Sequence, residues 1–178
     1  MLVTLLMGAP LFAANPGSSL GVRVKIEGKA GYKDVKGSST RTKTQSRILK
    51  IEVSNLGKEE VPATKVKWTV FGHRMKDHKL VELKSGEKSI IVPSEDSVEF
   101  SSSEVIASGT REHTVSARKR SRGKTRTTSK KVAASGEEYY GYAVEVYVGG
   151  KRVAAKYSQP SLGKELHSEK ITGKQLRK

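Results

Sequence analysis

The 178-residue chain contains no cysteine. This absence excludes disulfide bridges, thiolate zinc sites and a cysteine nucleophile. Aromatic residues are also scarce, at 6% of the sequence with a single tryptophan, and no window shows a sustained helical period of 3.6 residues. Glycine, serine, threonine, valine and lysine are plentiful instead. We therefore expect short strands and turns that are stabilised by side-chain packing alone.

Motifs that carry catalysis are missing too. The sequence has no Gly-x-Ser-x-Gly, His-Glu-x-x-His or Walker-type pattern, and residues 28–31 lack the context of a dinucleotide-binding loop. His73 and His78 lie five residues apart in a predicted connection, His113 is isolated, and His167 lies near the C-terminus. Metal sites usually add carboxylate or cysteine support to their histidines. We therefore predict a protein without enzymatic activity, cofactor or metal site.

Long hydrophobic runs are confined to the N-terminus. Residues 1–14 carry no charge and end in Ala13-Ala14, which is typical of the apolar region and small-residue cleavage site of an export signal. The usual basic residues before that region are missing, and a buried first strand or a short anchor are the alternatives. The run is too short to span a bilayer as a helix, and no later segment is apolar enough. We predict an export signal and linker at residues 1–19 and no membrane-spanning segment. The protein is then expected in the periplasm or outside the cell, where association with the cell surface is one form.

Apolar and polar residues alternate with a period of two through much of residues 20–158. Four segments show this most clearly, and each is typical of a half-buried strand: residues 22–27, 49–53, 66–70 and 142–148. Shorter strands are expected at residues 80–84, 89–92 and 98–100. Seven or eight strands at this spacing predict one all-β domain, an antiparallel immunoglobulin-like sandwich. Its expected core residues are Val24, Leu49, Ile51, Val53, Trp68, Val70, Phe100, Val144 and Val146.

The clearest turn signal is Gly149-Gly150, which lies between two alternating runs and predicts a two-residue hairpin. Counting outward from this turn opposes Val144 to Ala155 and places Glu145 on the outer face of the sheet. Residues 159–178 are polar and basic. We predict that they form an extended or frayed C-terminal tail.

Several of these stretches resemble domains of bacterial adhesion proteins. Residues 49–57, which read Leu-Lys-Ile-Glu-Val-Ser-Asn-Leu-Gly, resemble the Val-x-Asn-x-Gly strand ending of cell-adhesion-related immunoglobulin-like domains. Lys67–Val70 and the predicted turn at Ser85-Gly86-Glu87 resemble the next strand and a later turn of those domains, and Tyr142–Val146 resembles the Tyr-x-Val-x-Val strand of fibronectin type III modules. The resemblance implies adhesion, pilus-associated or surface-scaffold roles without catalytic residues. The chain departs from the pattern in having no cysteine pair and in carrying a basic insertion.

Positive charge is concentrated in two segments. Of the formal net charge of +16, residues 33–50 contribute +5 and the basic insertion, residues 111–131, contributes +8. So dense a charge cannot be buried, so the insertion is predicted to be an exposed hairpin tip or a disordered loop. Such a cluster concentrates anionic ligands, although a solvated loop that only aids solubility is the alternative. The predicted anion-binding residues are Arg118, Lys119, Arg120, Arg122, Lys124, Arg126, Lys130 and Lys131.

Together these features predict an exported, non-catalytic binding, adhesion or surface-scaffold module, with pilus association as one form. Its partner would be an anionic polymer, such as a glycan, lipopolysaccharide or extracellular DNA, or another surface protein. The alternative is a basic protein that coats nucleic acid. Against that alternative, the basic insertion has no interleaved aromatic residues for base stacking, and no recognition helix is visible in the sequence.

Overall fold

The computed structural model describes residues 19–121 and 124–167. The predicted export signal therefore lies outside the described residues, except for Ser19 of its linker. The elements are β1 (Leu20–Asp34), β2 (Arg41–Asn55), β3 (Val61–Arg74), β4 (Leu80–Val92), β5 (Ser97–Ser101), β6 (Val105–Thr110), β7 (His113–Ser121), β8 (Lys124–Val132), β9 (Ser135–Val148), β10 (Lys151–Tyr157) and the helix α1 (Pro160–His167).

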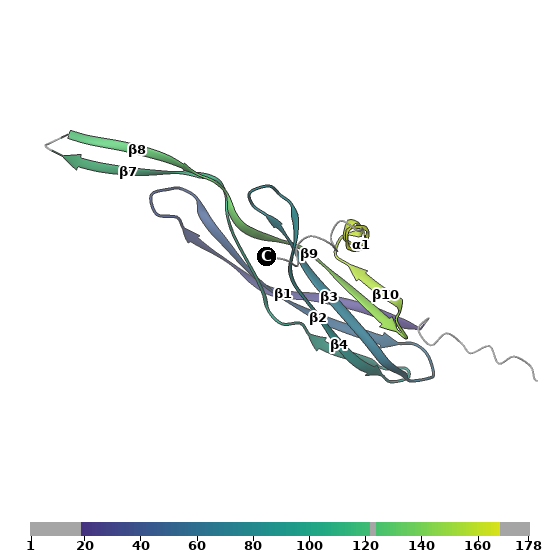
Figure 1. Cartoon of the computed structure of the whole chain (residues 1–178). Coiled ribbons are helices and arrows are strands. Elements are labelled where there is room, and N and C mark those ends of the chain that lie inside the picture. The colour runs from purple at the N-terminus through teal and green to yellow at the C-terminus, as the bar shows by residue number, and fades with distance from the viewer. Residues whose placement is uncertain (1–18, 122–123, 168–178) are drawn as a thin grey trace, which may run out of the picture.

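Eight of these strands form an all-β antiparallel sandwich (Figure 1). In one layer, β1 pairs with β2 along one edge, while β5 and β6 share the other edge of β2. In the other layer the strand order is β10, β9, β3, β4. The layers are joined where the end of β6 pairs with the first residues of β9. The all-β sandwich predicted from the alternation is confirmed.

The core lies between the two layers and consists mainly of aliphatic side chains from β2, β3 and β9. Eight of the nine predicted core residues are buried: Leu49, Ile51, Val53, Trp68, Val70, Phe100, Val144 and Val146. Val24 packs against this cluster but is only partly buried. Its strand, β1, is an edge strand, so Val24 has fewer neighbours than a residue of a central strand.

The turn predicted at Ser85-Gly86 is wrong. β4 runs through both residues without a break, and Gly86 lies directly opposite Trp68 of β3. A Cβ atom on Gly86 would come within 2.5 Å of the indole ring of Trp68. The glycine therefore marks a close approach of a large side chain within the sheet and not a reversal of the chain.

The hairpin predicted at Gly149-Gly150 is confirmed, with positive φ angles of 56° and 79° at the two glycines. The predicted register beyond it is wrong. A bulge at Val153 shifts the pairing, so that Ala155 lies opposite Glu145 and not opposite Val144. One extra residue in a strand moves every later side chain relative to its partner, and the alternation alone does not reveal such a bulge.

The extended tail predicted from residue 159 is also corrected, because residues 160–167 form α1. Leu162 of this helix is fully buried against Phe71 and Ala143, on the outer face of the β9 layer. Gly141 admits the helix closely, since a Cβ atom there would lie 2.9 Å from Leu162. So short a helix depends on tertiary packing. Within the described residues, no helix has the length and apolar character needed to cross a membrane.

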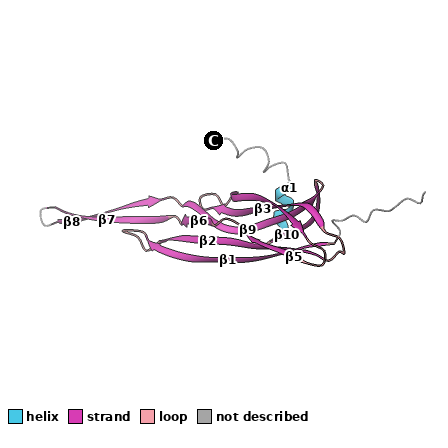
Figure 2. Ribbon diagram, turned by 90° about the horizontal axis from the view of Figure 1, so that it is seen from below, coloured by secondary structure: helices cyan, strands magenta, loops and turns pink. Residues whose placement is uncertain are grey.

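β7 and β8 form a separate two-stranded sheet. Figure 2 shows this sheet continuing beyond the end of the sandwich, with no other strand against its outer part. We call the paired strands β7 and β8 the arm, and we call the eight-stranded sandwich with α1 the body.

Candidate anion-binding arm

The arm is a regular antiparallel ribbon with nine residues in each strand. Its pairing runs from His113 opposite Val132 to Ser121 opposite Lys124, with no shift in register. Residues 113–132 contain eight lysines and arginines and no acidic residue. At about 3.3 Å per residue, each strand extends about 30 Å. The basic insertion is thus an ordered hairpin along most of its length.

Seven of the eight anion-binding residues predicted from the sequence belong to the two strands of this hairpin. Arg122 lies outside the described residues, and for Lys119 and Lys124 the structure gives the position in the strands only. The side chains that are described are all exposed: Arg118, Arg120, Arg126, Lys130 and Lys131. The structure therefore brings the predicted residues together on one projecting element.

Basic side chains project from both faces of the arm. Directly opposed residues share a face and successive residues alternate, so the register places Arg118, Arg120 and Lys131 on one face. Arg126 and Lys130 lie on the other face. The arm is therefore positively charged all round and does not present a charged and an uncharged side.

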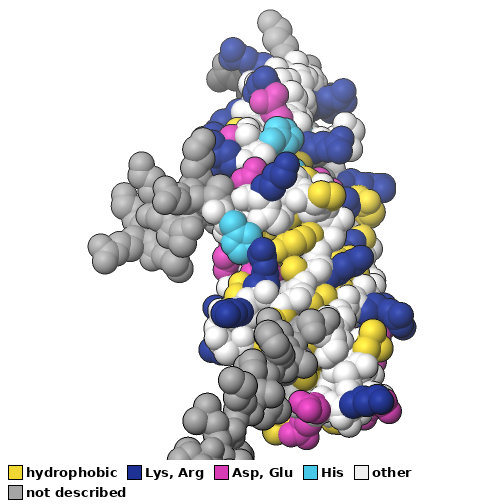
Figure 3. Space-filling view, turned by 90° about the vertical axis from the view of Figure 1, so that its right-hand side faces the viewer, with side chains coloured by type: hydrophobic (Ala, Val, Ile, Leu, Met, Phe, Trp, Pro, Cys, Tyr) yellow, Lys and Arg dark blue, Asp and Glu magenta, His cyan; other side chains and the backbone are white. Residues whose placement is uncertain are grey.

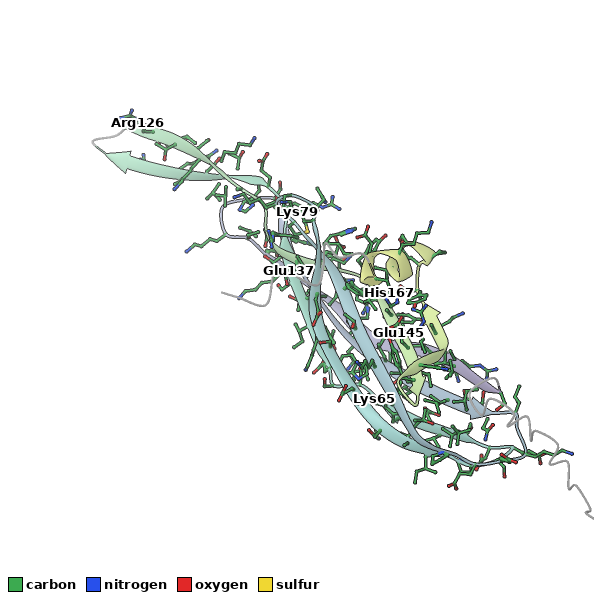
Figure 4. The ribbon with its side chains drawn as sticks, turned by 45° about the vertical axis from the view of Figure 1, so that its right-hand side comes forward. Lys65, Lys79, Arg126, Glu137, Glu145 and His167 are labelled. Atoms are coloured by element: carbon green, nitrogen blue, oxygen red, sulfur yellow. The ribbon has the colours of Figure 1, made fainter. Side chains whose placement is uncertain are left out.

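These charges are almost entirely uncompensated. Lys131 pairs with Glu112 at the base of the arm, with 2.8 Å between Nζ and Oε1. Among the described residues, no acidic group pairs with Arg118, Arg120 or Arg126. Figure 4 shows Arg126 far out on the arm, away from the rest of the molecule. An isolated two-stranded hairpin is only marginally stable. The exposed basic side chains of the arm bury no apolar surface, so they contribute little to the stability of the body.

The base of the arm is held by the turn between β1 and β2. The amide of Ser116 donates a hydrogen bond of 3.0 Å to the carbonyl oxygen of Gly37, which has a positive φ of 76°. A Cβ atom on Gly37 would lie 3.2 Å from both Ser116 and Val115. The second basic segment of the sequence, residues 33–50, is thereby brought to the same end of the molecule as the arm.

Two open grooves flank the base of the arm, with volumes of about 490 Å³ and about 680 Å³. Both are lined by Met75, Arg111, Glu112 and Glu138. In the smaller groove, Lys43 already pairs with Glu138 at 2.5 Å. The mixed charge of their lining distinguishes these grooves from the uniformly basic arm. The residues that line these grooves come from distant parts of the chain, so the sequence did not predict the grooves. The net charge of residues 33–50 was the only signal in the sequence for this region.

Positive charge is not restricted to the arm. Figure 3 shows Lys and Arg side chains distributed over the face that it presents, with acidic side chains among them. In the body several of these bases are paired, as in Lys50 with Glu27 at 2.8 Å and Arg23 with Glu52 at 3.6 Å. What distinguishes the arm is therefore a run of eight bases with no acidic residue in residues 113–132, and not the presence of bases as such.

A second cluster of polar side chains surrounds Glu145, under α1 (Figure 4). The Glu145 side chain is only 5% exposed. Its Oε1 atom accepts hydrogen bonds from Tyr157 at 2.6 Å, from Arg152 at 2.8 Å and from His167 at 2.8 Å. Its Oε2 atom accepts a hydrogen bond of 2.7 Å from Tyr147. Glu145 therefore lies on the outer face of the sheet, as the sequence predicted, but α1 covers that face and buries the side chain.

The environment of Glu145 keeps its carboxylate ionised. Burial raises the pKa of Glu145, but the hydrogen bonds from Tyr157, Tyr147, Arg152 and His167 outweigh burial and lower this pKa to about 2. Burial, together with the hydrogen bond to Glu145, raises the pKa of Tyr147 and the pKa of Tyr157 to about 12. Both carboxylate oxygens are occupied by donors from the protein. The cluster therefore ties α1 and β10 to β9.

The histidines lie in different surroundings. The His73 ring packs against the Tyr140 ring, with 4.0 Å between the ring centroids, and His78 is exposed. His113 begins the arm, and His167 contacts Glu145. Within residues 19–121 and 124–167, no three potential ligands of the His, Cys, Asp or Glu type come together as a metal site.

Comparison with known proteins identifies no family. No family model matches the sequence, and no curated protein matches it either. Two solved structures are similar at 15% identity and a TM-score of 0.34 each. One is the Northeast Structural Genomics Consortium target SoR45, for which the match covers 66% of this chain and 88% of that chain. The other is a protein from Akkermansia muciniphila, for which it covers 83% of this chain and 74% of that chain.

Proposed function

We propose that this protein is a non-catalytic binding module whose arm binds an anionic polymer. The observation that carries the proposal is the arm itself, whose two strands have seven basic residues, no acidic residue and no described side chain in the main core. An element with this much self-repulsion opposes its own folding unless an anionic partner neutralises it. Clustered lysine and arginine on an exposed ribbon create the potential that concentrates such a partner.

The proposal extends to the setting in which the module acts. We propose that the module is exported and acts in adhesion or as a surface scaffold, with pilus association as one form. The apolar residues 1–14 support export, and the resemblance to cell-adhesion-related immunoglobulin-like domains supports the adhesion role. Mass spectrometry of the native protein should then find a mature start near Ala14 or Asn15. An intact Met1 terminus in a cytoplasmic fraction would favour the basic, nucleic-acid-coating protein instead.

The experiment that tests polymer binding is retention on heparin across a salt gradient. The arm variant replaces six bases by glutamine: Arg118, Lys119, Arg120, Arg122, Lys124 and Arg126. The matched control removes the same charge from exposed lysines of the body: Lys25, Lys29, Lys58, Lys79, Lys151 and Lys156. Binding that depends on counterion release weakens log-linearly with salt, by about one power of ten per tenfold in salt for each phosphate-like contact.

We expect the arm variant to elute at much lower salt than the control variant, because the arm gathers its bases on one projecting hairpin, whereas the six body lysines are spread over several elements. Both variants should keep the unfolding temperature of the wild type, since all the replaced side chains that are described are exposed. Equal elution of the two variants would show that the arm is only a solvated hairpin. The partner would then have to contact a sheet face or edge of the body.

A further inference from the structure

We infer that the arm binds duplex DNA by entering its major groove. This inference rests on the function proposed above and specifies the polymer. The first argument is shape. The major groove of B-DNA is about 12 Å wide and about 8.5 Å deep, and it admits a two-stranded β-ribbon. The arm is such a ribbon, with a regular register, and no other strand lies against its outer part (Figure 2).

The second argument is the chemistry of one face of the arm. The register sets Arg118 opposite Thr127 and Arg120 opposite Thr125, so these four exposed side chains form two neighbouring cross-strand pairs. Arginine donates two hydrogen bonds to the O6 and N7 atoms of guanine, and threonine hydroxyls bond to base edges or phosphates. The two pairs are about 7 Å apart along the strand, which is close to the rise of two base-pair steps.

The third argument is that the opposite face is charged as well. Arg126 and Lys130 project from that face, and they would lie at the mouth of the groove when the first face meets its floor. The phosphates line the two sides of that mouth, where these cations can contact them. A flat anionic surface would engage one face and leave the charges of the other unused.

The arm lacks the features that other nucleic-acid binding modes require. Residues 113–132 contain no phenylalanine, tyrosine or tryptophan, so they have no platform for stacking the bases of a single strand. The side chains between the bases are mainly serine, threonine, alanine and valine. These short side chains let the ribbon backbone approach the floor of a groove.

The test compares two variants of the full chain that remove equal charge from opposite faces of the arm. One is Arg118→Gln with Arg120→Gln, and the other is Arg126→Gln with Lys130→Gln. Binding is measured by fluorescence anisotropy at one salt concentration. The probes are a GC-rich DNA duplex of about two helical turns, the same duplex methylated at guanine N7, the corresponding RNA duplex, and heparin.

We expect the Arg118/Arg120 variant to lose roughly 10- to 100-fold in affinity for the DNA duplex, because it loses contacts to base edges. The Arg126/Lys130 variant should lose only several-fold, and heparin should not distinguish the two variants. Methylation of guanine N7 should weaken wild-type binding, since that atom projects into the major groove. The RNA duplex should bind more weakly than DNA, because side chains cannot read its deep and narrow major groove.

Equal losses of the two variants on DNA, together with no effect of N7 methylation, would overturn the groove inference while leaving an arm that binds polyanions. RNA or heparin bound as tightly as DNA would do the same. The proposed function itself fails in a different way. In that case the six-residue arm variant would bind every one of these polymers as the control variant does.

Discussion

At the scale of single residues, the Glu145 carboxylate makes the clearest prediction about pH. Folding lowers the pKa of Glu145 from an ordinary value of 4.5 to about 2, so the folded state favours the ionised form. The resulting stabilisation is fully present above about pH 4.5 and is lost as the pH falls towards 2, with an upper limit of about 3 kcal/mol. Glu145→Gln should lower the free energy of unfolding at pH 7, and this deficit should shrink between pH 4.5 and pH 3.

Urea unfolding of the wild type and the Gln variant over this pH range measures the effect. Lys50 with Glu27 offers a control, because that ion pair is exposed and its removal should change stability little at any pH. A deficit for Glu145→Gln that stays constant from pH 7 to pH 3 would contradict the proposed ionisation of Glu145 in the folded state.

Trp68 makes a second prediction at this scale. The side chain is 7% exposed, belongs to the main core and covers Gly86 on the neighbouring strand. Trp68→Ala should therefore lower the free energy of unfolding by about 3 to 5 kcal/mol, through lost burial and the cavity left behind. Chemical denaturation followed by circular dichroism gives this value. A loss below about 1 kcal/mol would mean that the indole contributes no more than a surface side chain does.

At the scale of elements, the sequence predicted the strands because their signal is local. Leu49, Ile51 and Val53 alternate with polar residues, and this alternation needs no knowledge of the partner strand. The bulge at Val153 and the helix α1 depend on contacts between distant residues. Leu162 is stabilised by Phe71 and Ala143, and neither of these is near it in sequence. The clustering of the bases is a local property, so the sequence predicted it. Their distribution over the two faces of one ribbon depends on how β7 and β8 pair, and the sequence did not predict it.

The arm also gives a prediction as an element. His113 and Val132 are direct partners at its base, so replacing residues 114–131 by Asn-Gly would close the ribbon with a two-residue turn. The body should then fold with an unfolding temperature within a few degrees of the wild type, because the main core contains no described side chain of β7 or β8. Differential scanning calorimetry measures this temperature. A large decrease would mean that the contact between Gly37 and Ser116 stabilises the β1–β2 end of the body.

At the scale of the whole molecule, the net charge of +16 predicts how the protein meets an anionic polymer. Distributed positive charge accelerates the encounter, whereas close contacts determine how long the complex lasts. Surface plasmon resonance on immobilised heparin separates the two rates. Removing the six body lysines named above should lower the association rate and leave dissociation unchanged, whereas removing the six arm bases should mainly speed dissociation. The reverse pattern would place the binding surface on the body.

The position of the arm also determines how the molecule would carry tension. β1 begins at the end of the sandwich opposite to the arm, and it is paired with β2 over fifteen residues (Figure 1). If a polymer held the arm while the start of β1 was pulled away, the load would run parallel to these two strands. Their hydrogen bonds lie across that direction, so they would resist together and not open one after another. In the arm, both strands would share the pull, and the ribbon would not be unzipped. We therefore expect the β1–β2 pairing to resist stretching of the molecule along its long axis.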